Sequence, residues 1–333
     1  MKKITALFLS AVCSLAICAP VLSGCGDDGV KFTLSEEGGK HYIVSYSGYS
    51  SPTGEYEIPA YYGEGENYAP VTEIAHEGFS STNYSKIIVP ATVTKIGNAA
   101  FSFCYSLERV EFEEGIKLDK INHGMFGSST ALQEIKIPDS VKTIEGLAFY
   151  ECTSLSSVTM NFVETIGVRA FDKCRALEEI SLPSTLKTIG TLAFSNSGLK
   201  SISIPESVCD TKKVDDGGNE SVIYGLGYAS FLNCVNLESV KIANGVETIP
   251  SGTFGCCTAL KEVYLPLSIK EIQGVYSEKG VPVYGHAFYY DDALQDIYYE
   301  GSEEQWKDIK IDYTLFESYV NNDAIKNARK HYN

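Results

Sequence analysis

The sequence is short of basic residues and of histidine. It has 27 Lys and Arg against 43 Asp and Glu, a formal net charge of −16, and only 5 His. This balance gives no electrostatic footprint for a phosphate backbone or an anionic lipid surface, which argues against nucleic acid as a partner. The chain also has no His-Glu-x-x-His, Gly-x-Ser-x-Gly or Walker motif, and its carboxylates are not paired with a candidate base. We therefore expect neither enzyme activity nor a cofactor.

Proline is scarce as well, at 11 residues against 29 Gly, and no collagen-like period is present. With 44% hydrophobic and 21% charged residues, the composition is that of an ordered protein. The length of 333 residues exceeds the roughly 250 to 300 at which a single compact core stops growing. The chain must therefore form several domains or one elongated repeat fold.

Residues 1–24 have the pattern of an export signal. A short positive region and an apolar run are closed by Leu22-Ser23-Gly24-Cys25. Those four residues resemble the lipobox of bacterial lipoproteins, which implies that Cys25 is acylated and that the chain is cut before it. An ordinary secretory signal or an uncleaved membrane anchor stays open, because the apolar run could nearly span a bilayer. We expect an exported protein, held by lipid at the cell envelope or outer surface, with residues 25–31 as a leash.

Beyond this leash, one pattern repeats to the end of the chain. Phenylalanines recur at spacings of 22 to 25 residues, apart from two longer gaps of 37 and 34. They lie at positions 79, 101, 126, 149, 171, 194, 231, 254 and 288. A period near 23 predicts a solenoid, in which each repeat buries its apolar residues only by stacking on its neighbours.

The second half of each repeat reads as a short strand with alternating apolar residues. Clear copies are Leu132–Pro138, Leu177–Pro183, Leu199–Pro205 and Leu260–Pro266, and weaker copies begin at Tyr84, Leu107, Leu155, Leu237 and Leu294. The period of two sends the outer apolar pair inward, and the closing Pro ends the strand because it has no N–H to donate. About ten turns at a strand spacing of roughly 4.8 Å predict a mainly β arc on the order of 50 Å long, with a parallel sheet along one side.

The full unit, Leu-x-x-Ile-x-Ile-Pro-x-x-Val-x-x-Ile-Gly-x-x-Ala-Phe-x-x-Cys, resembles the BspA-like (Treponema pallidum type) leucine-rich repeat. The resemblance implies a leucine-rich-repeat horseshoe and a bacterial surface or secreted protein, of which some are adhesins, but it does not imply the ligand. We expect an N-terminal capping turn at 32–70, repeats at 71–299 and a C-terminal capping segment at 300–333. In that segment Ser302 and Gln305 form a capping box, and Trp306 is placed to cover the last apolar layer.

Cysteines suggest a disulfide framework or a metal site, but their register argues against both. The slot three residues after the Phe holds Cys104, Cys152, Cys174, Cys234 and Cys257, and Ser, Thr or Asp in other repeats. We expect buried free thiols, since metal ligands come as close pairs and these recur once per turn without a His. A bridge that involves Cys209 or Cys256 stays open.

Two insertions interrupt the period, near 209–222 and 273–283. The first carries the acidic run Asp215-Asp-Gly-Gly-Asn-Glu220, which could hold calcium. It lacks the alternating ligands and closing Glu of an EF-hand loop, so a solvated loop is favoured.

The residue between the two inward apolars of each strand points to solvent. In successive copies it is Glu111, Lys136, Thr159, Ser181, Ser203, Lys241, Tyr264 and Tyr298. Because Tyr is a stiff, amphipathic contact residue, we predict a ligand anchor at Tyr264 and Tyr298, reinforced by Tyr289 and Tyr290. The alternative is that Tyr264 and Tyr298 only stack on each other and stabilise the end of the sheet.

These features together predict a lipid-anchored, monomeric surface protein with a leucine-rich-repeat scaffold. We expect the scaffold to bind or adhere to a protein or glycan of a host or bacterial surface, with membrane contact only through the lipid on Cys25. A polysaccharide-binding module at the cell surface is the alternative.

Overall fold

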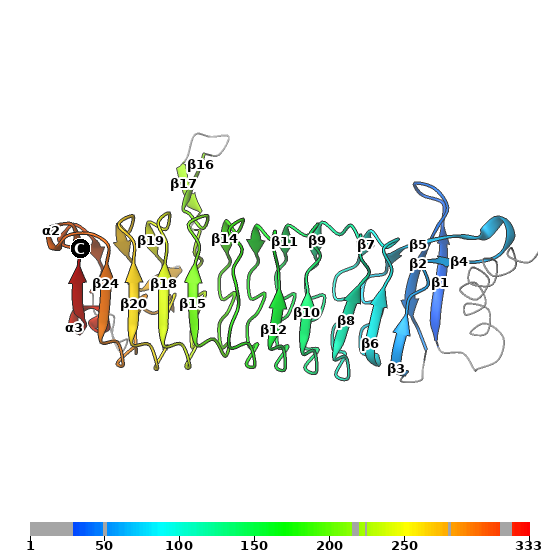
Figure 1. The fold of residues 1–333 in the computed structure, drawn as a ribbon, viewed down its shortest axis with the longest axis horizontal. Helices are drawn as coiled ribbons and strands as arrows, with labels where there is room; N and C mark the ends of the chain where they lie inside the picture. The colour runs from blue at the N-terminus through cyan, green and yellow to red at the C-terminus, as the bar shows by residue number, and fades with distance from the viewer. Residues whose placement is uncertain (1–28, 49–51, 215–219, 224, 279–280, 314–321) are drawn as a thin grey trace, which may run out of the picture.

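The computed structural model describes residues 29–48, 52–214, 220–223, 225–278, 281–313 and 322–333. Its strands follow one another in a row from the N-terminal to the C-terminal end, which confirms the predicted solenoid (Figure 1). Cys25 lies outside the described residues, so the structure does not bear on its lipidation. Within the described ranges, no helix combines the length and the apolar character needed to cross a bilayer.

One side of the solenoid consists of two five-stranded sheets of parallel strands. The first has the order β12-β10-β8-β6-β3 and the second the order β15-β18-β20-β24-β26. The bounds of the first are β3 (Thr53–Glu57), β6 (Asn83–Val89), β8 (Arg109–Phe112), β10 (Glu134–Lys136) and β12 (Ser157–Thr159). Those of the second are β15 (Ser201–Ile204), β18 (Ser239–Ile242), β20 (Glu262–Leu265), β24 (Asp296–Tyr299) and β26 (Arg329–Tyr332).

The strand expected at Leu177–Pro183 is not formed, and the two sheets are separated at this repeat. Ile180 and Leu182 still pack against the core as half-buried side chains. The alternating pattern therefore reports burial correctly there, whereas the backbone does not join the hydrogen-bonded ladder. The Phe rings of this repeat and the next one still stack, with 5.2 Å between the ring centroids of Phe171 and Phe194.

A second side is formed by two-residue strands that carry one Ile each, which is buried in all of them except β25, where Ile311 is half-buried. They form the sheets β14-β13-β11-β9 and β19-β21-β25, and β7 continues the row toward the N-terminus by pairing with β5. Their bounds are β7 (Lys95–Ile96), β9 (Lys120–Ile121), β11 (Thr143–Ile144), β13 (Thr165–Ile166), β14 (Thr188–Ile189), β19 (Thr248–Ile249), β21 (Glu271–Ile272) and β25 (Lys310–Ile311).

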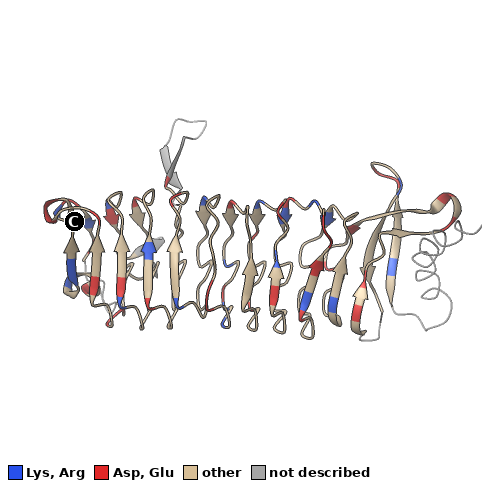
Figure 2. Cartoon of the chain, in the orientation of Figure 1, with Lys and Arg blue, Asp and Glu red and all other residues tan. Residues whose placement is uncertain are grey.

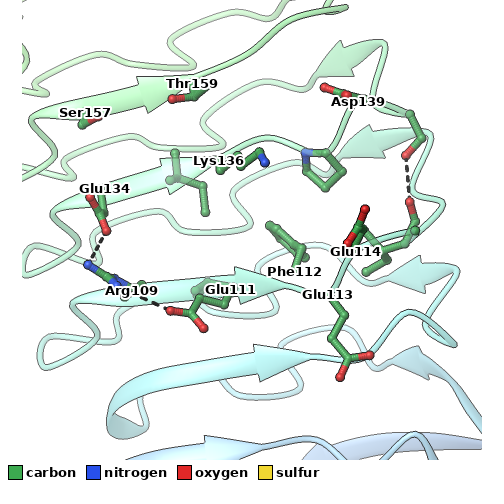
Figure 3. A pocket seen from close by; sticks show the side chains of 16 residues that line it. Arg109, Glu111, Phe112, Glu113, Glu114, Glu134, Lys136, Asp139, Ser157 and Thr159 are labelled. Carbon is green, nitrogen blue, oxygen red and sulfur yellow. Dashed lines mark hydrogen bonds and ion pairs between the residues drawn. The ribbon is translucent and has the colours of Figure 1, made fainter.

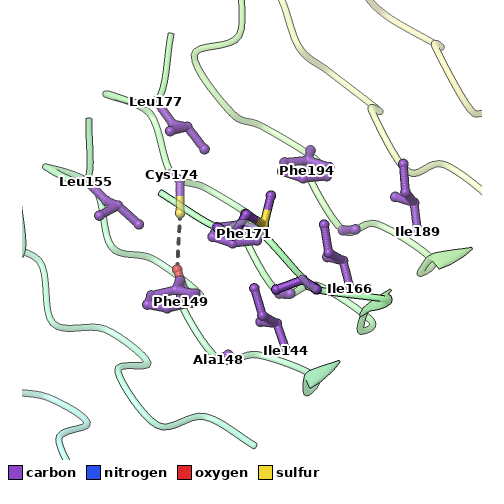
Figure 4. Close-up of a cluster of buried hydrophobic side chains, with 14 of the residues drawn as sticks. Ile144, Ala148, Phe149, Leu155, Ile166, Phe171, Cys174, Leu177, Ile189 and Phe194 are labelled. Carbon is purple, nitrogen blue, oxygen red and sulfur yellow. Dashed lines mark hydrogen bonds between the residues drawn. The ribbon is translucent and has the colours of Figure 1, made fainter. Parts of the chain in front are cut away.

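The third side contains the Phe residues that define the period. All nine of them are 0% exposed, and neighbouring rings stack with centroids 5.0 to 6.0 Å apart. Figure 4 shows Phe149, Phe171 and Phe194 in this column, beside the Ile side chains of the short strands. The predicted Phe column is thereby confirmed as the centre of the core.

From Phe79 to Phe254, the residues two before and two after each Phe have a positive φ, which the sequence pattern does not predict. In the Phe149 turn, Leu147 and Glu151 have φ of 58° and 59°, a region that side chains with a Cβ usually avoid. The N–H groups of these two residues and of Phe149 donate to three carbonyls of the next repeat, at 2.8, 2.9 and 3.0 Å. Hydrogen bonds between repeats thus offset the backbone strain within each repeat.

The slot three residues after the Phe forms a column of hydrogen-bond donors. Cys174 Sγ lies 3.2 Å from the carbonyl oxygen of Phe149 in the preceding repeat, and Ser129 Oγ lies 2.6 Å from that of Phe101. The thiols of Cys104, Cys152, Cys234 and Cys257 make the same contact at 3.1 to 3.3 Å. In these six repeats the slot therefore holds a small side chain with a donor, whereas Thr82 donates to the Phe79 carbonyl of its own repeat and Asp291 accepts the N–H of Cys257. The five cysteines are buried and free, which confirms that prediction.

The N-terminal end is closed by a mixed sheet. Its strands are β1 (Val30–Ser35), β2 (His41–Tyr46), β4 (Tyr61–Tyr62) and β5 (Ala69–Ile74), and the 3-10 helix η2 (Gly65–Asn67) lies between β4 and β5. The side chains of Tyr42, Val44 and Val71 are buried in it. The strand expected at Tyr42–Tyr46 is confirmed as β2.

Both insertions leave the solenoid as antiparallel hairpins. The first is β16 (Thr211–Val214) with β17 (Glu220–Ile223), and the second is β22 (Tyr276–Glu278) with β23 (Val281–Tyr284). The acidic run at 215–219 lies outside the described residues, so the calcium alternative stays open.

The C-terminal end begins with the helix α2 (Glu303–Lys307). Ser302 and Gln305 form the expected capping box, and Trp306 packs edge-on against Tyr299 with ring centroids 5.5 Å apart. The chain then adds β25, the helix α3 (Asp323–Asn327) and β26, so the sheet extends one strand beyond the predicted last copy.

Candidate functional site

The solvent-facing column of the strand side is formed as predicted. Lys136 is paired with Thr159, and Lys241 lies between Ser203 and Tyr264 in the register of the second sheet. Their side chains are exposed, and so is that of Ser181, although its segment is not a strand. Glu111 and Tyr298 are half-buried members of the same column.

Toward the C-terminal end this column becomes a stack of three rings. Tyr264 and Tyr298 have centroids 4.6 Å apart at 10°, and Tyr298 and His331 of β26 have centroids 4.6 Å apart at 14°. The packing interpretation is right in that Tyr264 and Tyr298 stack on each other. Tyr264 is nevertheless 36% exposed, so the stack presents ring edges and hydroxyls to solvent. A role of this surface in ligand binding stays a prediction.

Polar groups fix the stack on both sides. Tyr264 Oη donates to Glu262 at 3.1 Å, and this hydrogen bond raises the pKa of Tyr264. Asp296 lies 2.8 Å from His331 Nε2 and 2.8 Å from a guanidinium nitrogen of Arg329. The hydrogen bonds from His331 and Arg329 hold the pKa of Asp296 below its usual range. Asp296 therefore positions both residues of the last strand.

Tyr289 and Tyr290 do not belong to this stack. They follow Phe288 in the Phe turn, with centroids 5.5 Å apart, and the Tyr289 carbonyl accepts the N–H of Cys256 at 2.7 Å. Tyr290 is 44% exposed. The four predicted residues thus form two pairs on different sides of the repeat, and a ligand that touches both pairs would have to reach around the end of the solenoid.

A groove that the sequence did not reveal lies nearer the N-terminal end of the strand side, over β8 and β10 (Figure 3). It has a volume of about 790 Å³, with Phe112 and Ile116 among its apolar lining. Arg109 forms ion pairs with both Glu111 and Glu134 across it. The available signal was the Phe101 to Phe126 spacing of 25 residues, the longest apart from the two insertions.

The cysteines of the slot are buried and hold their protons. Burial raises the pKa of the Cys152 and Cys174 thiols far above the ordinary value, so neither is a reactive thiolate. Cys209 and Cys256 are free. In the described part of the chain, no group of three or more His, Cys, Asp and Glu side chains is arranged to hold a metal ion.

The model of the BspA type leucine rich repeat region matches residues 72–161, 116–213 and 219–277, in 6 copies. Similar solved structures include a leucine rich cell surface protein from Faecalibacterium prausnitzii A2-165, at 21% identity over 88% of this chain and 98% of that one, with a TM-score of 0.48. Pneumococcal vaccine antigen PcpA is 18% identical over 86% of this chain and 98% of that one, with a TM-score of 0.40. The T. pallidum leucine rich repeat protein is 20% identical over 72% and 81%, with a TM-score of 0.34. The comparison with curated proteins gives no match. With its repeats matched over more than half of its length, the chain belongs to the BspA-type leucine-rich-repeat family.

Proposed function

We propose that the chain is a lipid-anchored, non-enzymatic protein of the bacterial surface. Its repeat scaffold would bind a macromolecule of a host or bacterial surface through the strand side. The predicted export signal before Cys25 supports a location at the cell surface, and membership of the family supports the role of a scaffold. A solenoid suits this role because its stacked repeats present one long surface on a rigid core.

The observation that carries the proposal is the change along the outward column. It is charged or small from Glu111 to Lys241 and then becomes the ring stack of Tyr264, Tyr298 and His331. Core packing does not require this change, since these side chains point away from the core. Aromatic side chains that are already held in place lose little conformational entropy on binding, which makes them suitable anchors.

The double variant Tyr264→Ala with Tyr298→Ala tests the proposal against purified matrix proteins and a glycan array. We expect binding to weaken about 30-fold, as for a hot spot of about 2 kcal/mol, while the melting temperature falls by only about 1 to 3 °C through the loss of two cross-strand ring contacts. Tyr105→Ala is the matched control, because Tyr105 is 58% exposed and lies on the loop after the Phe turn. A lowered melting temperature with full binding would show that the stack serves packing only.

The alternative function, a polysaccharide-binding module, predicts binding to glycans and not to proteins in the same experiment. A sugar packs on an aromatic ring through the face of the ring, and the faces between Tyr264, Tyr298 and His331 are covered by the neighbouring rings. Glycan-array signal that disappears in the double variant, without binding to any protein, would support a polysaccharide module.

A further inference from the structure

Among the described strands, β26 is the outermost strand of the second sheet. β26 pairs with β24 along one edge, and no other strand of the described chain continues the sheet on its far side (Figure 1). The side chains of Arg329, His331 and Tyr332 are exposed, and Lys330 is half-buried. An edge strand with unpaired backbone groups is a template for another strand.

The hydrogen bonds of β26 show which backbone groups are available. The Arg329 N–H donates to Gln295 at 2.8 Å and the Asn333 N–H to Gly301 at 3.2 Å, so both point back into the protein. Because successive residues of a strand present their N–H and C=O groups to opposite edges, those of Lys330 and Tyr332 point outward. The edge therefore offers two donors and two acceptors at the spacing of a parallel ladder.

This edge is basic in a protein that is otherwise acidic. Residues 322–333 contain Lys326, Arg329 and Lys330 against Asp323, and Asp296 of β24 pairs with Arg329, so this end keeps a small positive excess, whereas the whole chain has a formal net charge of −16. Figure 2 shows Lys and Arg on this last strand. Two copies of β26 would repel each other, since charges of the same sign would face each other across the junction. An acidic strand would be attracted.

The ring stack points to the same occupant. One face of the His331 ring covers Tyr298, and His331 belongs to the edge strand, so its other face lies toward the open side. An added strand with an aromatic or apolar residue in this column would continue the stack at the spacing seen between Tyr298 and His331.

We propose that β26 binds an extended acidic segment of a partner protein by strand addition. Acidic side chains of that segment would face Arg329, and an aromatic or apolar side chain would cover His331. The inference rests on the proposed function, because it specifies the partner chemistry of that scaffold. It places the recognition of a peptide strand at the tip of the solenoid.

The probe is a fluorescein-labelled peptide of alternating glutamate and valine with one central tyrosine, and the same peptide with lysine for glutamate is its control. The chain that starts at Cys25 should bind the glutamate peptide, and it should bind the lysine peptide at least about tenfold more weakly. Tyr332→Pro removes an outward N–H and places a ring against the incoming strand, so affinity should fall about tenfold or more relative to Tyr332→Ala.

Hydrogen exchange keeps the proposal testable if Tyr332→Pro disturbs the fold. In the unmodified chain, the glutamate peptide should slow exchange of the Lys330 and Tyr332 amides, because strand addition gives each of them an acceptor. Equal binding of both peptides, or binding without this protection, would overturn the proposal. So would concentration-dependent self-association that Tyr332→Pro removes while no peptide binds, since the occupant would then be a second copy. None of these outcomes changes the matrix-protein and glycan results for the Tyr264 and Tyr298 double variant, so the two proposals fail separately.

Discussion

Replacing Phe171 by Ala tests whether stacked repeats hold the fold together. Phe171 is 0% exposed and lies between two rings, with centroids 5.0 Å from Phe149 and 5.2 Å from Phe194. The substitution removes a buried ring and leaves a cavity that the stiff neighbouring turns cannot close. It also removes two aromatic contacts, each of which contributes about 0.5 to 1.5 kcal/mol beyond its buried area.

We expect the free energy of unfolding to fall by about 3 to 5 kcal/mol, as in other Phe to Ala substitutions in packed cores. With an unfolding entropy of about 2.1 cal/mol/K per residue, each kcal/mol lowers the melting temperature of a chain of this size by roughly 1.4 °C, so the shift should be about 4 to 7 °C. Because each repeat of a solenoid contacts only its neighbours, a weakened central layer should also broaden the transition.

Thermal unfolding followed by circular dichroism measures both effects. Phe162→Ala is the control, since Phe162 is 44% exposed and loses only a cation–π contact with Lys142, so the stability should change by no more than about 1 kcal/mol. If Phe171→Ala melts within about 2 °C of the parent, the Phe column is not the element that holds the repeats together.

Three other variants test the lipid anchor at Cys25, the hydrogen bond of Cys174 in the donor column, and the buried carboxyl group of Asp291. Cys25→Ala removes the thiol that would carry lipid, so the protein should leave the membrane fraction, and unchanged partitioning into detergent would refute lipidation. Cys174→Ser keeps a donor for the Phe149 carbonyl and should remain more stable than Cys174→Ala by about 0.5 to 1.5 kcal/mol in chemical unfolding; equal midpoints would remove the hydrogen bond from the explanation. Burial raises the pKa of Asp291 well above its usual value. The unfolded chain therefore loses this proton more readily than the folded chain, and the stability of the fold decreases as the pH rises above the ordinary pKa of a carboxyl group. Asp291→Asn, which keeps an acceptor for the Cys257 N–H, should therefore melt higher than the parent at pH 7, and the gain should disappear near pH 4; a lower melting temperature at pH 7 would contradict this.

The sequence predicted the parts of the fold that depend on one residue type recurring at a fixed spacing. The Phe column, the small slot that includes Cys174, and the capping box of Ser302 are confirmed because each position has a steric demand that few residues meet. The outward direction of Tyr264 was predictable for the same reason, since the period of two is a property of the strand itself.

The remaining features depend on contacts between segments that are distant in the sequence. Leu177–Pro183 has the alternation of a strand, but a strand exists only where its backbone reaches a neighbour. The sequence of β26 has no apolar alternation that predicts a strand. Asp296 on β24 holds the polar side chains of Arg329 and His331 in place. Tyr264 and Tyr298 lie on a different side of the repeat from Tyr289 and Tyr290. The repeat period alone does not predict this, because it does not specify the shape of the repeat in cross-section.

The alternating backbone of the Phe turns gives the solenoid a net dipole along its axis. In the turns from Phe79 to Phe231, three N–H groups point toward the C-terminal neighbour, and the carbonyls of the same peptide units point the other way, as with the His123 carbonyl and the Gly124 N–H. Each peptide unit has a dipole of about 3.5 D, so the columns add in the manner of a helix, with the positive pole at the C-terminal end. At that pole the Asn322 side chain accepts the N–H of Phe288 at 3.1 Å, which is the role of a helix N-cap. The field of the folded backbone thus favours negative charge at the end of the solenoid where the chain places β26.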